Sequence, residues 1–258
     1  MLSLEQYGDV TRLRFSTRAS RALGYDSSAY ATRGMLVDTG FPAVARDLDA
    51  WLDRERPAGV LITHHHEDHA GNLELVARRG IPVAVSDATL EAIRDLRPLG
   101  LYRRVCWGSP PPLRSPIVPF VPAGLALLPS PGHIADHHVV WDAERRTLFA
   151  GDLFLGVKVR VAQDTERIPV LVRSLRAAIA LEPGRMFCAH RGLVPDPVGA
   201  MRAKADWLDE LMRGVERLRA AGASEDRIVK ELLGREGVTR WLTGGEVSKH
   251  NLVRSARR

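Results

Sequence analysis

Histidine is concentrated in three short parts of this 258-residue chain, which indicates a site for metal chemistry. Eight of the nine histidines fall at 64–69, at 133–138 and at 190. The densest segment, THHHEDH at 63–69, lies between an apolar run and a helical pattern, so a sharp turn can direct several side chains into one pocket. Imidazoles with a carboxylate suit Zn, with Fe or Mn as alternatives. The side chains expected to face the pocket are His64, His66, Asp68 and His69.

Three further candidate ligands follow other predicted strands. His133 ends the turn Ser-Pro-Gly-His, Asp152 ends Ala-Gly-Asp, and His190 ends Cys-Ala-His. Each is weak evidence alone, but the four strand ends together supply enough ligands for two divalent ions. His65 and Glu67 alternate with the ligands of the first segment and are expected to point away from the metal.

The elements that must position these residues alternate between short apolar runs and helical patterns, which is typical of an α/β fold. Strands are predicted at 10–16, 35–38, 59–63, 81–85, 125–128, 138–141, 147–150 and 186–189. Helices are predicted at 42–55, 70–79, 87–96 and 169–181, and residues 108–116 form a proline-rich loop.

The composition shifts near residue 196, which predicts a catalytic domain over 1–196 and a helical extension over 197–258. Asp196 and Pro197 suit the start of a long helix that ends at Gly222. Two more helices are expected at 224–233 and 246–257. The extension is expected to pack over the main domain, and the sequence leaves open whether it also contacts substrate.

The overall composition, with 45% hydrophobic and 26% charged residues, excludes a disordered chain and a disulfide-stapled miniature. No apolar run approaches the roughly 20 residues of a membrane span, and the N-terminus lacks a signal-peptide core. A cytoplasmic enzyme or binding protein without a membrane partner is therefore expected. The two cysteines, Cys106 and Cys188, are expected to be buried and unpaired. The oligomeric state is not indicated.

The motifs HxHxDH, PGH, GD and a final His occur in the order that resembles the metallo-β-lactamase superfamily, over about residues 10–195. The resemblance implies an αββα four-layer sandwich with the metal site at one edge, between two sheets. It also implies that Asp38 lies behind the ligands and orients one of the histidines. The implied ligand sets are His64, His66 and His133 for one ion, Asp68, His69 and His190 for the other, and Asp152 as the bridge.

Several departures from the usual family pattern narrow the function. Gly71-Asn72 replaces the usual Gly-Gly, and Ala189-His190-Arg191 replaces Gly-His-Gly, so the substrate rim differs from the commonest members. Asp152 disfavours a true β-lactamase, and His66 disfavours the redox chemistry of the flavodiiron branch. The short segment between Asp152 and His190 leaves no room for the large insertion of the β-CASP nucleases, which process DNA and RNA.

A hydroxide bridging two metal ions is the expected nucleophile, with Asp68 orienting it or shuttling its proton. The leading hypothesis is a hydrolase of a small thioester, lactone or related ester, resembling the glyoxalase II-like branch. The alternatives are a nuclease of single-stranded RNA, suggested by PGHIADH at 131–137 and by the basic extension, and a non-catalytic metal-binding protein. The substrate-binding residues are not indicated.

Overall fold

The computed structural model describes residues 1–95 and 98–257, and two β-sheets form its centre. The first sheet has six strands in chain order, antiparallel from β1 to β4 and parallel from β4 to β6. Its strands are β1 (Leu2–Tyr7), β2 (Val10–Phe15), β3 (Ser27–Thr32), β4 (Met35–Val37), β5 (Val60–Leu61) and β6 (Val83–Ala84).

The second sheet has five strands in the order β12-β11-β9-β8-β7, and only β9 and β11 run parallel. Apolar side chains of both sheets, among them Tyr30, Phe149 and Phe187, form one buried cluster between them. The strands are β7 (Ala126–Pro129), β8 (His138–Asp142), β9 (Thr147–Phe149), β11 (Arg185–Cys188) and β12 (Gly192–Val194).

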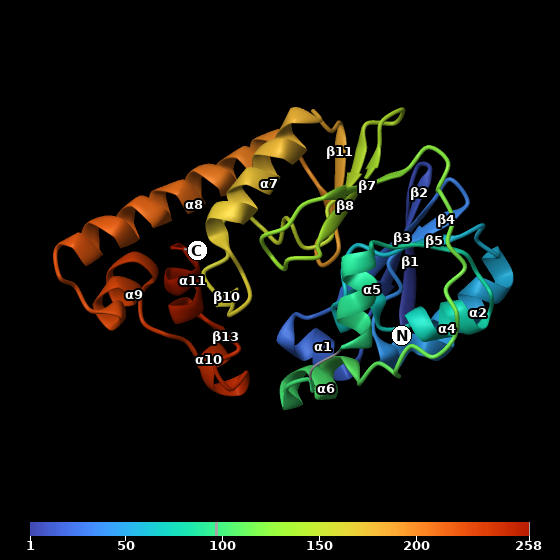
Figure 1. Cartoon of the computed structure of the whole chain (residues 1–258), viewed down its shortest axis with the longest axis horizontal. Helices are drawn as coiled ribbons and strands as arrows, with labels where there is room; N and C mark the ends of the chain where they lie inside the picture. The colour runs from blue at the N-terminus through green and yellow to red at the C-terminus, as the bar shows by residue number, and fades with distance from the viewer. Residues whose placement is uncertain (96–97, 258) are drawn as a thin grey trace.

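Helices cover the outer faces of both sheets (Figure 1). One buried cluster joins the first sheet to α2 and α4, and another joins the second sheet to α7 and α8. The layers therefore run helix, sheet, sheet, helix, which confirms the expected αββα sandwich. The helices are α1 (Arg18–Leu23), the 3-10 helix η1 (Pro42–Val44), α2 (Ala45–Glu55), α3 (Glu67–Ala70), α4 (Leu73–Arg78), α5 (Asp87–Arg94), α6 (Leu101–Trp107), α7 (Ile168–Ala180) and α8 (Pro197–Ala220).

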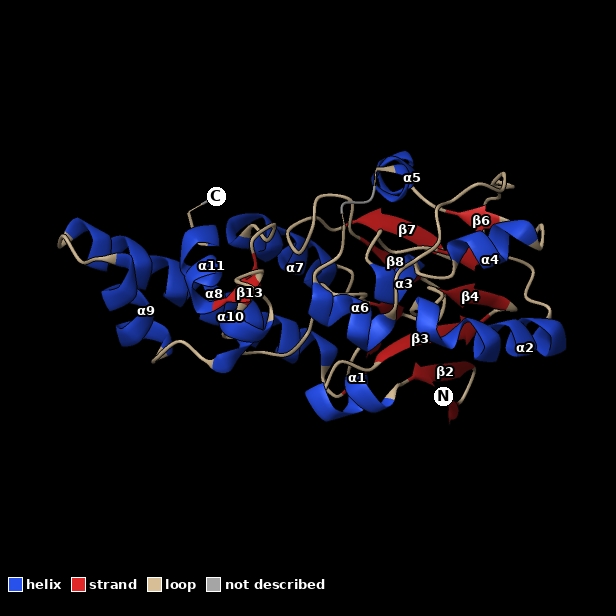
Figure 2. Ribbon diagram, turned by 90° about the horizontal axis from the view of Figure 1, so that it is seen from below, coloured by secondary structure: helices blue, strands red, loops and turns tan. Residues whose placement is uncertain are grey.

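The C-terminal extension stands at one end of the molecule, where α8 runs alongside α7 (Figures 1 and 2). It continues through α9 (Glu225–Leu233), α10 (Val238–Leu242), β13 (Val247–Ser248) and α11 (Lys249–Ser255). β13 pairs with β10 (Ala162–Gln163), which belongs to the loop between β9 and α7. The extension is thereby joined to the rest of the chain by a strand pair as well as by α8, and the division at residue 196 stays a prediction.

Most predicted elements occur with shorter bounds, and two predicted helices differ in an informative way. The helix expected at 70–79 is broken between α3 and α4, because the Asn72 amide donates to the carbonyls of Thr39 and Phe41 at 2.8 and 3.0 Å. The helix expected at 246–257 begins only at Lys249, because Val247 and Ser248 pair with β10 and Ser248 caps α11. The end of the helix expected at 87–96 lies outside the described residues.

Several elements were not predicted. They include β1, β3, α1, α6, α10 and the short pair β10–β13. The Ser- and Ala-rich sequence of β3, SSAYAT, lacks the apolar alternation that marks a strand. Cys106 and Cys188 are buried and unbridged, as expected.

Candidate metal centre

The first ligand segment, the turn after β5, is held by a buried acid from the neighbouring strand. Asp38 follows β4 with a left-handed backbone, at φ 63°. Its carboxylate accepts hydrogen bonds from the Thr63 N–H at 2.8 Å and the Thr63 hydroxyl at 2.9 Å. It also accepts the Nδ1–H of His69 at 2.8 Å, which leaves Nε2 of that ring as the free ligand atom. Asp38 therefore contacts His69, and its role in orienting that ring for a metal stays a prediction.

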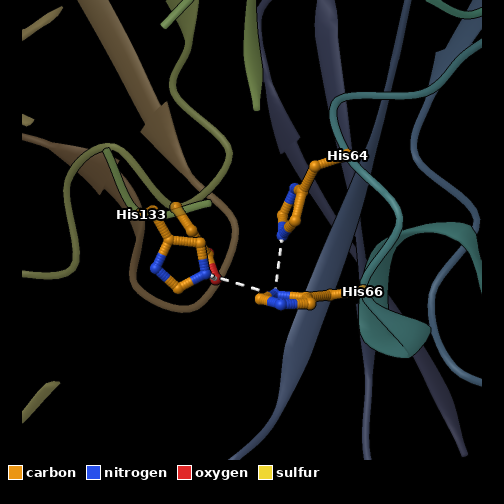
Figure 3. A group of neighbouring side chains, drawn as sticks. His64, His66 and His133 are labelled. Carbon is orange, nitrogen blue, oxygen red and sulfur yellow. Dashed lines mark hydrogen bonds and ion pairs between the residues drawn. The ribbon is translucent and has the colours of Figure 1, made fainter. Parts of the chain in front are cut away.

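Four residues from three loops form one group of candidate ligands. Nδ1 of His66 lies 3.0 Å from Nε2 of His64 and 3.2 Å from Nε2 of His133, so three ring nitrogens converge (Figure 3). His133 comes from the loop between β7 and β8, and its Nδ1 lies 3.4 Å from Glu166. Asp152, after β9, completes this group, whose ligand atoms all lie within 4.8 Å of one another.

Three other residues, Asp68, His69 and His190, form a second group. Their ligand atoms also all lie within 4.8 Å of one another. Nε2 of His190 lies 3.4 Å from Oδ2 of Asp68, and Nε2 of His69 lies 3.7 Å from the same oxygen. The Nδ1–H of His190 donates to the carbonyl of Asp26 at 2.8 Å, which directs Nε2 toward the site.

Asp152 faces both groups with different oxygens. Its Oδ2 lies 3.3 Å from Nε2 of His133, whereas its Oδ1 lies 3.2 Å from Nε2 of His190 and 3.4 Å from Nε2 of His69. The backbone N–H of Asp152 donates to Nε2 of His137 at 3.0 Å, and His137 donates from Nδ1 to the Ser130 hydroxyl at 2.8 Å. His137 is therefore a positioning residue that the sequence analysis did not identify.

The ionisation of these side chains follows from burial and from the carboxylates among them. Burial, reinforced by neighbouring imidazoles, holds the pKa values of His64 and His66 well below the usual range. Both rings are therefore neutral and can offer a nitrogen lone pair to a metal ion. Burial also opposes the charging of His69 and His190, but Asp152 and Asp68 outweigh it. They raise the pKa of His69 well above its usual range and that of His190 to about 9. The carboxylates therefore favour positive charge at the second group.

Two candidate ligand atoms lack the partners that buried polar atoms require. Within the described residues, Nε2 of His69 and Oδ1 of Asp152 are buried and accept or donate no hydrogen bond. Such atoms are costly unless something binds them. A divalent ion between neutral imidazoles and carboxylates would satisfy both atoms and supply the positive charge that the acids favour. The residues present therefore fit a metal.

Comparison with known proteins assigns the chain to a family. The profile of the metallo-beta-lactamase superfamily matches residues 29–190, more than half of the chain. The chain belongs to this superfamily. The family places it among metal-dependent hydrolases.

Curated relatives of the chain fall into more than one named group. A Drosophila melanogaster protein named beta-lactamase-like protein 2 homolog is 28% identical over 217 residues, covering 74% of this chain and 69% of its own length. The Caenorhabditis elegans protein of the same name is 27% identical and is covered over 65% of its length. A hydroxyacylglutathione hydrolase from a Shewanella strain is 33% identical over 165 residues, covering 60% of this chain and 56% of its own length.

Solved superfamily structures share the fold at low sequence identity. DIM-1 metallo-beta-lactamase superposes with a TM-score of 0.59 at 16% identity, covering 80% of this chain and 95% of that chain. FIM-1 from Pseudomonas aeruginosa superposes with a TM-score of 0.59 at 14% identity, covering 80% of this chain and 93% of that chain.

In residues 1–95 and 98–257 of this protein, no helix is long and apolar enough to cross a membrane.

A cavity of about 310 Å³ opens onto both ligand groups. Its other walls are mainly apolar and aromatic, and they come from α6, from the loop before α7 and from β13 of the extension. Two arginines, Arg103 and Arg191, also line it. The apolar and aromatic lining residues are Tyr25, Tyr102, Trp107, Leu155, Val159, Val161, Ala162 and Val247.

The two residues expected to point away from the ligands each have a buried partner. Nδ1 of His65 donates to Asp136 at 2.9 Å. Glu67 is paired with Arg103, whose Nη2 donates to it at 2.6 Å. Nη1 of the same guanidinium donates to Glu246 of the extension at 2.7 Å. The metal-binding turn is thus connected to the C-terminal extension through one buried arginine.

Proposed function

We propose that the chain is a two-ion hydrolase of a small thioester, lactone or related ester. The observation that carries the two-ion assignment is the placement of Asp152, whose two oxygens face different groups of imidazoles. A carboxylate in this position can bind both ions. The proposed ligands are His64, His66 and His133 for the first ion, Asp68, His69 and His190 for the second, and Asp152 for both.

Two divalent ions at these ligands would polarise the attacked carbonyl and lower the pKa of a water molecule to near neutrality. Zn is the proposed metal, with Fe or Mn as alternatives, because the donors are imidazole nitrogens and carboxylate oxygens. The chain's own contribution is position and proton transfer. Asp38 and His137 fix His69 and Asp152 through the hydrogen bonds described above. Asp68 lines the cavity and is the proposed group that orients the attacking water and accepts its proton.

The dimensions of the cavity support a small substrate. Its volume of about 310 Å³ is at the lower end of the range for small-molecule sites, and its apolar lining suits an acyl or aryl group. Relatives named hydroxyacylglutathione hydrolase act, by that name, on a thioester. Both observations favour a thioester or ester of modest size over a large polymer.

The RNA alternative receives less support from the charges around the site. An adjoining cavity of about 620 Å³ is lined by Glu91 and Asp95, besides Glu67 and Glu246, which are paired with Arg103. The charges of Glu91 and Asp95 would disfavour a phosphate backbone that passed through it. The basic residues of the extension number 13 against 9 acidic ones, so its excess charge is small.

The test combines metal analysis with a substrate panel. Protein reconstituted with Zn, Fe or Mn is analysed for metal content and assayed on thioesters, lactones, phosphodiesters and single-stranded RNA. We expect two ions per chain and hydrolysis of thioesters or lactones. A firm value of one ion would refute the two-ion assignment, and cleavage of RNA alone would replace the proposed substrate class.

A further inference from the structure

The residue after the last proposed ligand is an arginine, where the superfamily motif usually has glycine. Arg191 follows His190 and lines the same 310 Å³ cavity as the proposed ligands His66, Asp68 and His133. A guanidinium at this position lies beside the place where the substrate must react. The Arg191 guanidinium is therefore a positive charge at the cavity that has no role in the proposed reaction itself.

The exposed side chain of Arg191 contacts the loop that follows Asp152. Its Nε donates to the carbonyl of Leu155. It also packs against Gly156, because a Cβ at that residue would lie 3.4 Å from Nε, Cζ and Nη2 of the arginine. Gly156 has φ +136°, which a residue with a side chain rarely adopts. The contact leaves the two Nη nitrogens as donors for another partner.

The two arginines of the cavity differ in their charge balance. Arg103 is neutralised by Glu67 and Glu246. By contrast, no carboxylate forms an ion pair with Arg191 within residues 1–95 and 98–257, and its hydrogen bond is to a carbonyl. A guanidinium that is positioned but not neutralised is suited to bind an anion that arrives with the substrate.

We propose that Arg191 binds a carboxylate carried by the substrate, while the apolar and aromatic walls hold the rest of it. The inference rests on the proposed function and names its substrate class: a carboxylate-bearing thioester or ester with an apolar or aromatic body. A carboxylate is favoured over a phosphate for two reasons. The two Nη donors match the two oxygens of a planar carboxylate, and the Glu166 carboxylate in the same cavity disfavours a dianion.

The test uses three thioesters that differ in one substituent: 4-(acetylthio)benzoate, 4-(acetylthio)benzamide and 4-(acetylthio)phenyl phosphate. Each is hydrolysed by metal-loaded wild-type protein and by R191Q and R191K. R202Q is the matched control, because Arg202 is an exposed arginine on α8, outside the cavity. The metal content of each variant is measured, and binding of benzoate and benzamide is followed by calorimetry.

We expect kcat/KM for the benzoate thioester to fall about 10- to 100-fold in R191Q, the loss typical of one charge-assisted hydrogen-bonded pair. R191K should lie between, the benzamide should change little, and R202Q should behave as wild type. Equal losses for benzoate and benzamide, or a wild-type preference for the phosphate, would overturn the carboxylate assignment.

Failure of the reaction and failure of the subsite can be told apart. If the wild-type protein hydrolyses none of these thioesters and none of the thioesters or lactones of the substrate panel, the proposed function fails. The binding measurement then still tests Arg191, because benzoate should bind more weakly to R191Q than to R202Q. Equal benzoate affinities in the two variants, at equal metal content, would overturn the inference on its own.

Discussion

Replacing Arg103 by methionine tests how the metal-binding turn is stabilised. The guanidinium side chain is 9% exposed and pairs with Glu67, which is 2% exposed, and with Glu246, which is 25% exposed. R103M would leave the Glu67 carboxylate buried without its cation, which costs about 3–5 kcal/mol of unfolding free energy. E246Q should cost at most about 1 kcal/mol, because that partner is partly solvated.

The cost of R103M should depend on pH in a defined direction. Burial raises the pKa of Glu67, and the charge of Arg103 opposes this rise. Without the arginine, the pKa of Glu67 rises further, so the folded variant binds a proton that the unfolded chain releases. Stability of the variant relative to wild type therefore falls as pH rises above the ordinary pKa of a glutamate, and the deficit grows until pH passes the raised pKa of Glu67 in the folded variant.

Urea unfolding of the chelator-treated protein between pH 5 and 8 measures this deficit without a contribution from bound metal. R104M is the matched control, because Arg104 is the neighbouring, exposed arginine of α6. The double variant E67Q/R103M should recover about 2 kcal/mol of the loss, since no buried charge remains. If R103M matched R104M at pH 8, or if the double variant were no more stable than R103M, the buried-charge explanation would be refuted.

Three further predictions follow from the site and its surroundings. D152A should lose most hydrolytic activity and one of two bound ions, while its circular dichroism spectrum stays unchanged. The control D206A changes an exposed residue of α8 and should keep both the activity and the two ions. D38N should weaken metal binding about 10- to 100-fold, measured by competition with a chelator, because the carboxylate that fixes His69 is lost; unchanged affinity would contradict this. Burial lowers the pKa of Lys204 from 10.5 to about 8. The unfolded chain therefore binds more protons between these values, so wild-type stability should rise from pH 8 to 10 relative to K204M, and a constant difference in urea unfolding would refute it.

The order of the candidate ligands along the chain was readable because each belongs to a short motif that ends a strand. THHHEDH follows the apolar run at 59–63, and the PGH and GD turns follow similar runs. A buried strand is marked by local apolar residues, and a turn by proline and glycine, so both patterns depend only on neighbours in the chain. The start of α8 was equally local, because the Asp196 side chain accepts from the Gly199 N–H three residues later.

The surroundings of the ligands depend on residues that are distant in sequence. Arg103 joins Glu67 to Glu246, and Glu246 lies 143 residues after Arg103 in the chain. No local pattern indicates such a pair, because its formation depends on how α6 and the extension pack. The same holds for β10 and β13, whose two residue pairs form only when the extension folds back over the loop before α7.

Sequence alone therefore determined the chemistry of the centre, because residue type and the nearest neighbours decide which atoms can bind a metal and where a strand ends. The tertiary structure decided the rest. It placed the two oxygens of Asp152 toward different imidazole groups and brought His137 to the backbone N–H of that aspartate. It also left Arg191 at the cavity without an acidic partner among the described residues. These outcomes depend on the relative position of two packed sheets and on the loops between them, which side chains far apart in the chain fix together.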